Sequence, residues 1–248
     1  MIKDKIVGHL CAAFTIFVWG ITFINTKYLV DYFTPIDIMV IRYVVAYISL
    51  FIISPKVLKF QGWKKEAWLF VAAMSGGAIY QYLENLAVYY TSPASVSFIS
   101  ALSPVLTAIV AHSLYSEKLN FKIIAGMMIS LLGVFFVSFG DSKISDTGLL
   151  GDLIILGAVW LWTVYSIVIK KIADFGLTQI EISRRIFLYS LLFIVPYSIL
   201  TPGKIELQYL LMPSSIINLA FLSVLASAVC FCTWNKGVIL LGPTPANK

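Results

Sequence analysis

The chain has 248 residues, of which 60% are hydrophobic and 12% are charged, and its formal net charge at pH 7 is +6. An average soluble domain is about 45–50% apolar and about 25% charged, and it needs those polar groups to cover its surface. The composition therefore excludes a water-soluble fold and predicts an all-α integral membrane protein that has the lipid bilayer as its main partner.

The first apolar run covers residues 6–26. A helix needs about 20 apolar residues to span a membrane, because each residue adds about 1.5 Å across a core of about 30 Å. The run does not end in a small-residue cleavage site, so we expect a retained helix and not a secretory signal. Cys11, Cys230 and Cys232 lie inside apolar runs. Buried free thiols are common there, which predicts neither a disulfide nor a metal site.

Seven further runs follow and bring the predicted transmembrane helices to eight. These seven cover residues 35–53, 67–89, 93–115, 121–140, 149–169, 179–200 and 214–236. The breaks between the runs are short and carry turn or charge signals, such as SPK at 54–56 and TPGK at 201–204. The sequence therefore predicts a compact bundle with short connections.

Lysines are distributed unequally between the two sides of these helices. Ten fall on one side: Lys3, Lys5, Lys56, Lys59, Lys64, Lys65, Lys118, Lys122, Lys170 and Lys171. Three fall on the other: Lys27, Lys143 and Lys204. Because cytoplasmic loops carry the excess of positive charge, we predict a multi-pass protein of the cell (inner) membrane with a cytoplasmic amino terminus. Topology accounts for the positive charge, so no nucleic-acid partner is expected.

The sequence also contains an internal repeat. At a constant offset of 143 residues the matching pairs are Gly8 and Gly151, Leu10 and Leu153, Trp19 and Trp162, Lys27 and Lys170, and Arg42 and Arg185. The tail VILLGPTPAN at 238–247 resembles LAVYYTSPAS at 86–95. The two copies start five helices apart, and because five is odd, the second copy should be inverted in the membrane.

This repeat divides the chain into residues 1–141, the first five-helix repeat, and residues 142–248, a second and incomplete repeat with three helices. The second copy lacks a counterpart to the last two helices of the first, which is roughly 45 residues at the length that such spans need. We therefore expect the natural protein to have ten helices.

One acidic residue, Glu84, lies inside an otherwise apolar segment. A charge at mid-membrane costs about 2.5–3.5 kcal/mol, so its side chain should face protein or water. Glu84 lies roughly 9 Å below the outer end of its helix and Arg42 roughly 10 Å below the same surface. We hypothesise that the two form a buried pair or share a polar cavity. They would either fix helix packing or contact a substrate or a coupling proton.

The corresponding positions of the second repeat carry different charges. Arg185 follows Glu181 by four residues, which places both on one side of a helix, and Lys236 aligns with Glu84. We predict that Arg184, Arg185 and Lys236 extend to the cytoplasmic interface, because long cationic side chains near helix ends usually do.

Further candidates for the cavity fall into three groups. Ser97, Ser100 and Pro104 recur at spacings of three and four and form a polar stripe with Pro93 and Thr107, which would line a cavity or allow close helix packing. Trp19, Phe23, Trp162 and Tyr165 would form aromatic walls for an apolar or cationic substrate, or pack and anchor helices. Tyr80, Gln81 and Asn85 would extend the polar patch around Glu84.

Several stretches together resemble the EamA-like family of the drug/metabolite transporter superfamily. They are VWGITF at 18–23 with Arg42, LAVYYTSPASVSFISALSPVLTAIVA at 86–111 with Glu117, GMMISLLGVFFV at 126–137 and WNKGVILLGPTPA at 234–246. The resemblance implies ten helices in two inverted repeats of five, and export of amino acids or other small metabolites across the bacterial inner membrane. The chain would lack the last two helices, of which the ninth usually lines the central cavity.

The predicted function is that of a secondary transporter working by alternating access, with a small-molecule substrate and no cofactor. No GxxxxGK[ST] phosphate loop is present. Two alternatives are a non-transporting truncated fragment or scaffold and a membrane-embedded enzyme. The enzyme is disfavoured because isolated His9 and His112 supply neither a nucleophile–base pair nor a metal cluster. A small zwitterion or amphipathic metabolite suits the sequence best, although a sugar or a hydrophobic cation would also fit. Direction, coupling ion and oligomeric state are not specified.

Overall fold

The computed structural model describes residues 2–115, 121, 124–126, 128, 129, 132, 146–201 and 206–246, and no strand occurs among them. Six helices in this part of the chain are long and apolar enough to cross a membrane: Lys3–Leu29, Pro35–Ile53, Pro93–Leu114, Gly148–Phe175, Gln179–Leu200 and Pro213–Leu241. The prediction of an all-α, multi-pass membrane protein is confirmed at this level.

Two of the eight predicted spans are not among these six. The span predicted at 67–89 is helical, as α3 (Trp63–Ala72), the π-helical segment η1 (Ala73–Ala78) and α4 (Ile79–Tyr90). It is less apolar than the others because Ser75, Gln81, Glu84 and Asn85 interrupt it. The span predicted at 121–140 lies largely outside the described residues.

The first two helices of the chain are α1 (Ile2–Leu29) and α2 (Pro35–Ile53). A capping box begins both α2 and the later helix α9 (Gln179–Leu200). The Asp37 carboxylate accepts from the backbone N–H of Thr34, at 3.3 Å, while the Thr34 hydroxyl accepts from the N–H of Asp37. Thr178 and Glu181 repeat this capping box at α9. Each box satisfies two N–H groups that have no partner within the helix, which explains why both helices begin where predicted.

The predicted span at 93–115 is interrupted near its middle. It forms α5 (Pro93–Ser100) and α6 (Ser103–Tyr115), separated by a turn at Ala101 and Leu102. Pro104 explains the break, because proline has no N–H to donate and its ring collides with the carbonyl four residues earlier.

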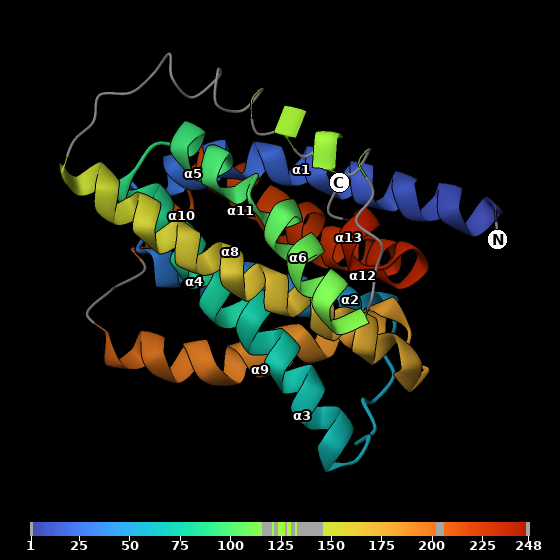
Figure 1. Ribbon diagram of the computed structural model, residues 1–248. Coiled ribbons are helices and arrows are strands. Elements are labelled where there is room, and N and C mark those ends of the chain that lie inside the picture. The colour runs from blue at the N-terminus through green and yellow to red at the C-terminus, as the bar shows by residue number, and fades with distance from the viewer. Residues whose placement is uncertain are drawn as a thin grey trace.

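The remaining elements are α8 (Asp146–Ile172), η2 (Ala173–Phe175), α10 (Leu207–Leu210), α11 (Pro213–Ala220), the π-helical segment η3 (Phe221–Val229), α12 (Cys230–Leu241) and α13 (Pro243–Ala246). Helices that are distant in the sequence lie side by side: α1 packs on α12 (Figure 1), α4 packs on α8, and α2 packs on α9. The core therefore lies between elements that precede residue 115 and elements that follow residue 146.

The two π-helical segments occupy related places in this packing. Each lies in the middle of a long helix, η1 against α9 and η3 against α2. Gly76 and Gly77 allow η1 to approach closely. A Cβ at Gly76 would lie 2.2 Å from the Tyr165 ring, and one at Gly77 would lie 2.2 Å from the Ser190 hydroxyl oxygen. At η1 the wide turns of the π-helix thus coincide with a close approach to elements that are distant in the sequence.

Much of the outer surface is apolar. Phe17 is 72% exposed on α1, and Ile199 and Leu200 are 78% and 83% exposed at the end of α9. Water-soluble monomers rarely expose large contiguous apolar surface, whereas lipid tails cover it at no cost. The surface therefore agrees with a bilayer as the surrounding solvent.

Candidate substrate cavity

A cavity of ≈ 350 Å³ lies among α1, α2, α4, α5, α6, α8 and α12. Cavities that bind small molecules usually have volumes of about 300–1,000 Å³. The size therefore suits a small metabolite, and the walls come from elements that precede residue 115 and from elements that follow residue 146.

Ten of the twelve residues predicted as substrate contacts line this cavity: Trp19, Phe23, Arg42, Tyr80, Gln81, Glu84, Ser97, Ser100, Pro104 and Trp162. Their helices are far apart in the sequence, and the fold brings these candidates together around one cavity. Their role as substrate contacts stays a prediction.

The other two predicted residues pack between helices and do not line the cavity. The Asn85 amide donates to the Pro35 carbonyl at 3.3 Å and thereby joins α4 to the start of α2. The Tyr165 hydroxyl donates to the Asn235 side chain at 2.6 Å, and its ring lies against Gly76. For these two residues the structure favours the packing role over the wall of the cavity.

Glu84 forms the acidic part of the cavity wall with neighbours on its own helix. One carboxylate oxygen accepts from the Tyr80 hydroxyl at 2.8 Å, and the other accepts from the Gln81 side-chain amide. The spacings of four and three residues place all three side chains on one face of α4. Both oxygens of this half-buried acid therefore have a donor.

Arg42 forms the basic part of the wall. Its Nε donates to the Ser227 hydroxyl at 2.5 Å, and that hydroxyl donates to the Leu222 carbonyl at 2.8 Å. Within the described part of the chain, Arg42 and Glu84 make no ion pair. Of the two arrangements predicted for them, they adopt the shared polar cavity and not the direct pair.

Three indoles form the apolar side of the cavity. The ring centroids are 5.1 Å apart for Trp19 and Trp162, 5.4 Å for Trp19 and Trp234, and 5.3 Å for Trp162 and Trp234. Tyr80 extends the cluster, with its ring centroid 4.9 Å from that of Trp162. Aromatic pairs at such distances are favourable beyond the area that they bury. The cluster therefore provides a closely packed aromatic wall beside Arg42 and Glu84.

Sequence reasoning missed two of the aromatic wall residues, Phe231 and Trp234 on α12. Trp234 opens the stretch at 234–246 that carries the resemblance to the family, but it was not singled out as a wall residue, and Phe231 lies before that stretch. Which face of a helix turns inward depends on packing against distant elements. The predicted stripe members Pro93 and Thr107 do not line the cavity, and Thr107 instead bonds to Thr163 of α8 at 3.5 Å.

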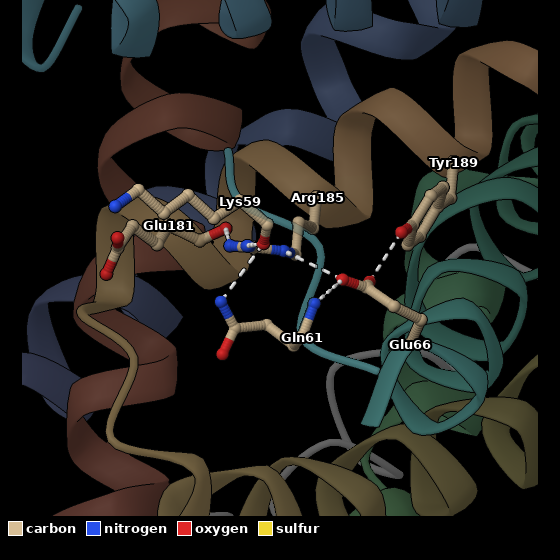
Figure 2. A network of polar contacts seen from close by, with 6 residues as sticks. All are labelled: Lys59, Gln61, Glu66, Glu181, Arg185 and Tyr189. Carbon is tan, nitrogen blue, oxygen red and sulfur yellow. Dashed lines mark hydrogen bonds and ion pairs between the residues drawn. The ribbon is translucent and has the colours of Figure 1, made fainter. Parts of the chain in front are cut away.

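A second polar network lies where α2 ends and α9 begins (Figure 2). The Arg185 guanidinium donates to the Lys59 carbonyl at 2.7 Å, and its Nε lies 3.8 Å from a Glu66 carboxylate oxygen. Glu66 also accepts from the backbone N–H of Gln61 at 2.9 Å and from the Tyr189 hydroxyl at 2.5 Å. The network joins residues 54–62 to α3 and α9.

Arg184 binds the first residues of the same loop, which covers residues 54–62. It donates to the carbonyls of Ser54 and Lys56 at 2.7 and 2.8 Å. Arg184 and Arg185 are each 2% exposed, so the prediction that their charged groups extend to the interface is wrong. The physical reason is that a non-helical loop offers free carbonyl groups, which satisfy the two guanidinium groups inside the protein. Lys236 is exposed, and its place at the cytoplasmic interface stays a prediction. Arg185 contacts the backbone carbonyl of Glu181, at 3.4 Å, while the Glu181 carboxylate caps α9.

Among the described residues, no group of three or more His, Cys, Asp or Glu side chains could hold a metal ion. The cavity therefore presents one acid, one base, hydroxyl groups and aromatic rings. A few polar groups among apolar and aromatic side chains are the usual lining of a pocket for a small molecule.

A model of the EamA-like transporter family matches residues 6–139. The uncharacterized transporter YyaM of Bacillus subtilis (strain 168) is 26% identical over 238 residues, which cover 92% of this chain and 76% of that protein. An uncharacterized transporter of Archaeoglobus fulgidus is 24% identical over 237 residues, which cover 91% of this chain and 78% of that protein. The crystal structure of a protein that is 16% identical to this chain superimposes on it with a TM-score of 0.73. The match covers 97% of this chain and 83% of that protein's chain, and it shows a similar fold.

Proposed function

Since the chain belongs to the EamA-like transporter family, we propose that it is a secondary transporter that moves a small metabolite through the Arg42–Glu84 cavity by alternating access. The family is one of transporters, and the chain is a multi-pass membrane protein. The observation that carries the proposal is the cavity itself. Buried charges within an apolar bundle are costly and usually mark a substrate or ion pathway.

The composition of the cavity wall supports alternating access. Trp19 and Arg42 come from the first predicted repeat, whereas Trp162 and Trp234 come from the second. A site between two inverted repeats can be exposed to either side when one repeat rocks against the other. The unequal division of lysines supports a cytoplasmic amino terminus in the inner membrane. In that orientation the network of Arg184 and Arg185 lies at the cytoplasmic end.

We propose export as the direction, on the resemblance to the family. The aromatic walls and the two opposite charges favour an amino acid or an amphipathic compound as the cargo. A coupling proton could bind at Glu84, the acidic residue of the cavity wall.

The test is release from proteoliposomes loaded with a defined mixture of neutral amino acids, aromatic acids, amines and sugars. We expect at least one compound to leave at least tenfold faster than from protein-free liposomes, and mass spectrometry of the external medium identifies it. A protein carrying both Arg42→Gln and Glu84→Gln should lose most of this release, while Lys59→Ala should keep it because the Lys59 side chain is exposed away from the cavity. Equal rates with and without protein for every class would contradict the proposal.

A further inference from the structure

The Arg42 guanidinium has more hydrogen-bond donors than its surroundings use. A guanidinium carries five N–H groups. Within the described part of the chain, the structure gives Arg42 one hydrogen bond, from Nε to Ser227, and its buried Nη1 has no partner. The side chain is 2% exposed and lines the cavity. A buried, permanently charged group in this state needs an acceptor that the described residues do not supply.

The Glu84 carboxylate, unlike the Arg42 guanidinium, has a hydrogen-bond partner for each of its polar atoms. Its two oxygens already accept from Tyr80 and Gln81, and the described residues show no ion pair between it and Arg42. Each oxygen of the Glu84 carboxylate therefore has at least one donor, whereas Nη1 of Arg42 has no acceptor among the described residues. This asymmetry favours an anionic ligand over a cationic one, because the group without a partner is the cation.

Ser227 keeps the guanidinium in one place. Its hydroxyl accepts from Nε and donates to the Leu222 carbonyl in η3, so the acceptor is itself anchored. The opposite edge of the guanidinium, which carries the Nη atoms, is the edge that matches a carboxylate bidentately. Ser227 is therefore a positioning residue, and Arg42 is the group that would touch the ligand.

The rest of the cavity defines the body of the ligand. Trp19, Trp162 and Trp234 provide flat apolar surfaces, and the volume of ≈ 350 Å³ limits the ligand to the size of a small metabolite. A ligand with a negative head and a compact apolar or aromatic body would satisfy both the guanidinium and the indoles.

We propose that the cavity binds a small organic acid, whose carboxylate accepts from the Nη atoms of Arg42 and whose apolar body lies against the three indoles. This inference rests on the proposed function, since it names the chemical class of the compound that the same cavity would transport. An anionic lipid headgroup has the same charge and is separated from a free acid by the experiment.

The test uses three ligands of one shape and different charge: phenylacetate, 2-phenylethanol and phenethylamine. Each is titrated into the full chain in phospholipid-free detergent, and binding is followed by tryptophan fluorescence. We expect phenylacetate to bind at least tenfold more tightly than 2-phenylethanol, and phenethylamine to bind most weakly. In Arg42→Gln the preference for phenylacetate should fall to less than twofold, while Arg42→Lys should keep part of it. The comparison of ligands in the unaltered protein does not depend on whether a variant folds.

Three results would overturn the inference. One is binding of phenethylamine or 2-phenylethanol as tightly as phenylacetate. Another is an undiminished preference for phenylacetate in Arg42→Gln. The third is displacement of phenylacetate by phosphatidylglycerol at stoichiometric amounts, since that would assign the site to a lipid headgroup. Proteoliposome release separates this outcome from failure of the proposed function: release of amines or sugars alone contradicts the organic acid, whereas tight phenylacetate binding without any release contradicts transport.

Discussion

Replacing Arg185 with alanine should lower the free energy of unfolding by about 3–5 kcal/mol, which is the usual cost of removing one partner from a buried ion pair. The substitution removes the contact with Glu66 and the hydrogen bond to the Lys59 carbonyl. It leaves an acidic side chain inside the protein, where Gln61 and Tyr189 are the donors that remain among the described residues. The measurement is unfolding of the protein in dodecyl maltoside micelles with increasing sodium dodecyl sulfate.

Arg184→Ala should have a similar effect for a related reason. Its two hydrogen bonds to the carbonyls of Ser54 and Lys56 join a charged donor to backbone acceptors, and such bonds contribute about 1.5–3 kcal/mol each. The guanidinium also lies over the ring of Phe51, at 5.0 Å from the ring centroid, and this favourable contact is lost as well.

Lys56→Ala and Lys59→Ala are the matched controls. Both lie in the same loop and both substitutions remove a positive charge, but Arg184 and Arg185 bond to their backbone carbonyls, which alanine retains. Because both side chains are exposed, we expect changes within about 0.5 kcal/mol. Equal losses for Arg185→Ala and Lys59→Ala would show that net charge, and not the buried network, stabilises this end of the bundle.

The second large effect should come from Ser227→Ala, which removes the hydroxyl that accepts from Arg42 Nε. We expect a loss of about 1.5–3 kcal/mol, because hydrogen bonds to charged groups fall in this range and the guanidinium stays buried. The same substitution should weaken phenylacetate binding without removing the preference for the anion, since the charge of Arg42 remains.

Ser223→Ala is the control for this change. Ser223 is also a buried serine of η3, but among the described residues its hydroxyl has one hydrogen bond, to the neutral Leu219 carbonyl at 2.6 Å. A neutral hydrogen bond of this kind contributes about 1 kcal/mol or less. If the two serine variants were equally stable and bound phenylacetate equally well, the positioning role of Ser227 would be wrong.

The sequence predicted how far along its helix a residue lies, but it did not predict toward which neighbouring helix its side chain points. Arg42 and Glu84 were placed at matching depths because each residue of a helix advances about 1.5 Å. Both line the same cavity. Asn85 was expected to face the cavity on its spacing from Gln81, yet it points to the start of α2. Rotation of a helix is decided by packing against distant elements.

Local chemistry predicted the ends of helices better than their interiors. Thr34 and Pro35 mark the start of α2, and the helix ends at Ile53 as predicted. The π-helical segments carry no comparable signal, since they follow from contacts such as that of Gly76 with Tyr165. Burial of Arg184 was missed because its acceptors, the carbonyls of the loop at 54–62, have no sequence signature.

The central claim is that the Arg42–Glu84 cavity holds a small compound, and anomalous diffraction tests it most directly. Crystals of the full chain would be grown with 4-bromophenylacetate, and data collected at the bromine absorption edge. We predict one bromine peak inside the cavity beside Trp19 and Trp162, with the carboxylate within hydrogen-bonding distance of Arg42. A cavity without bromine density, or a peak on the lipid-facing surface alone, would contradict the claim.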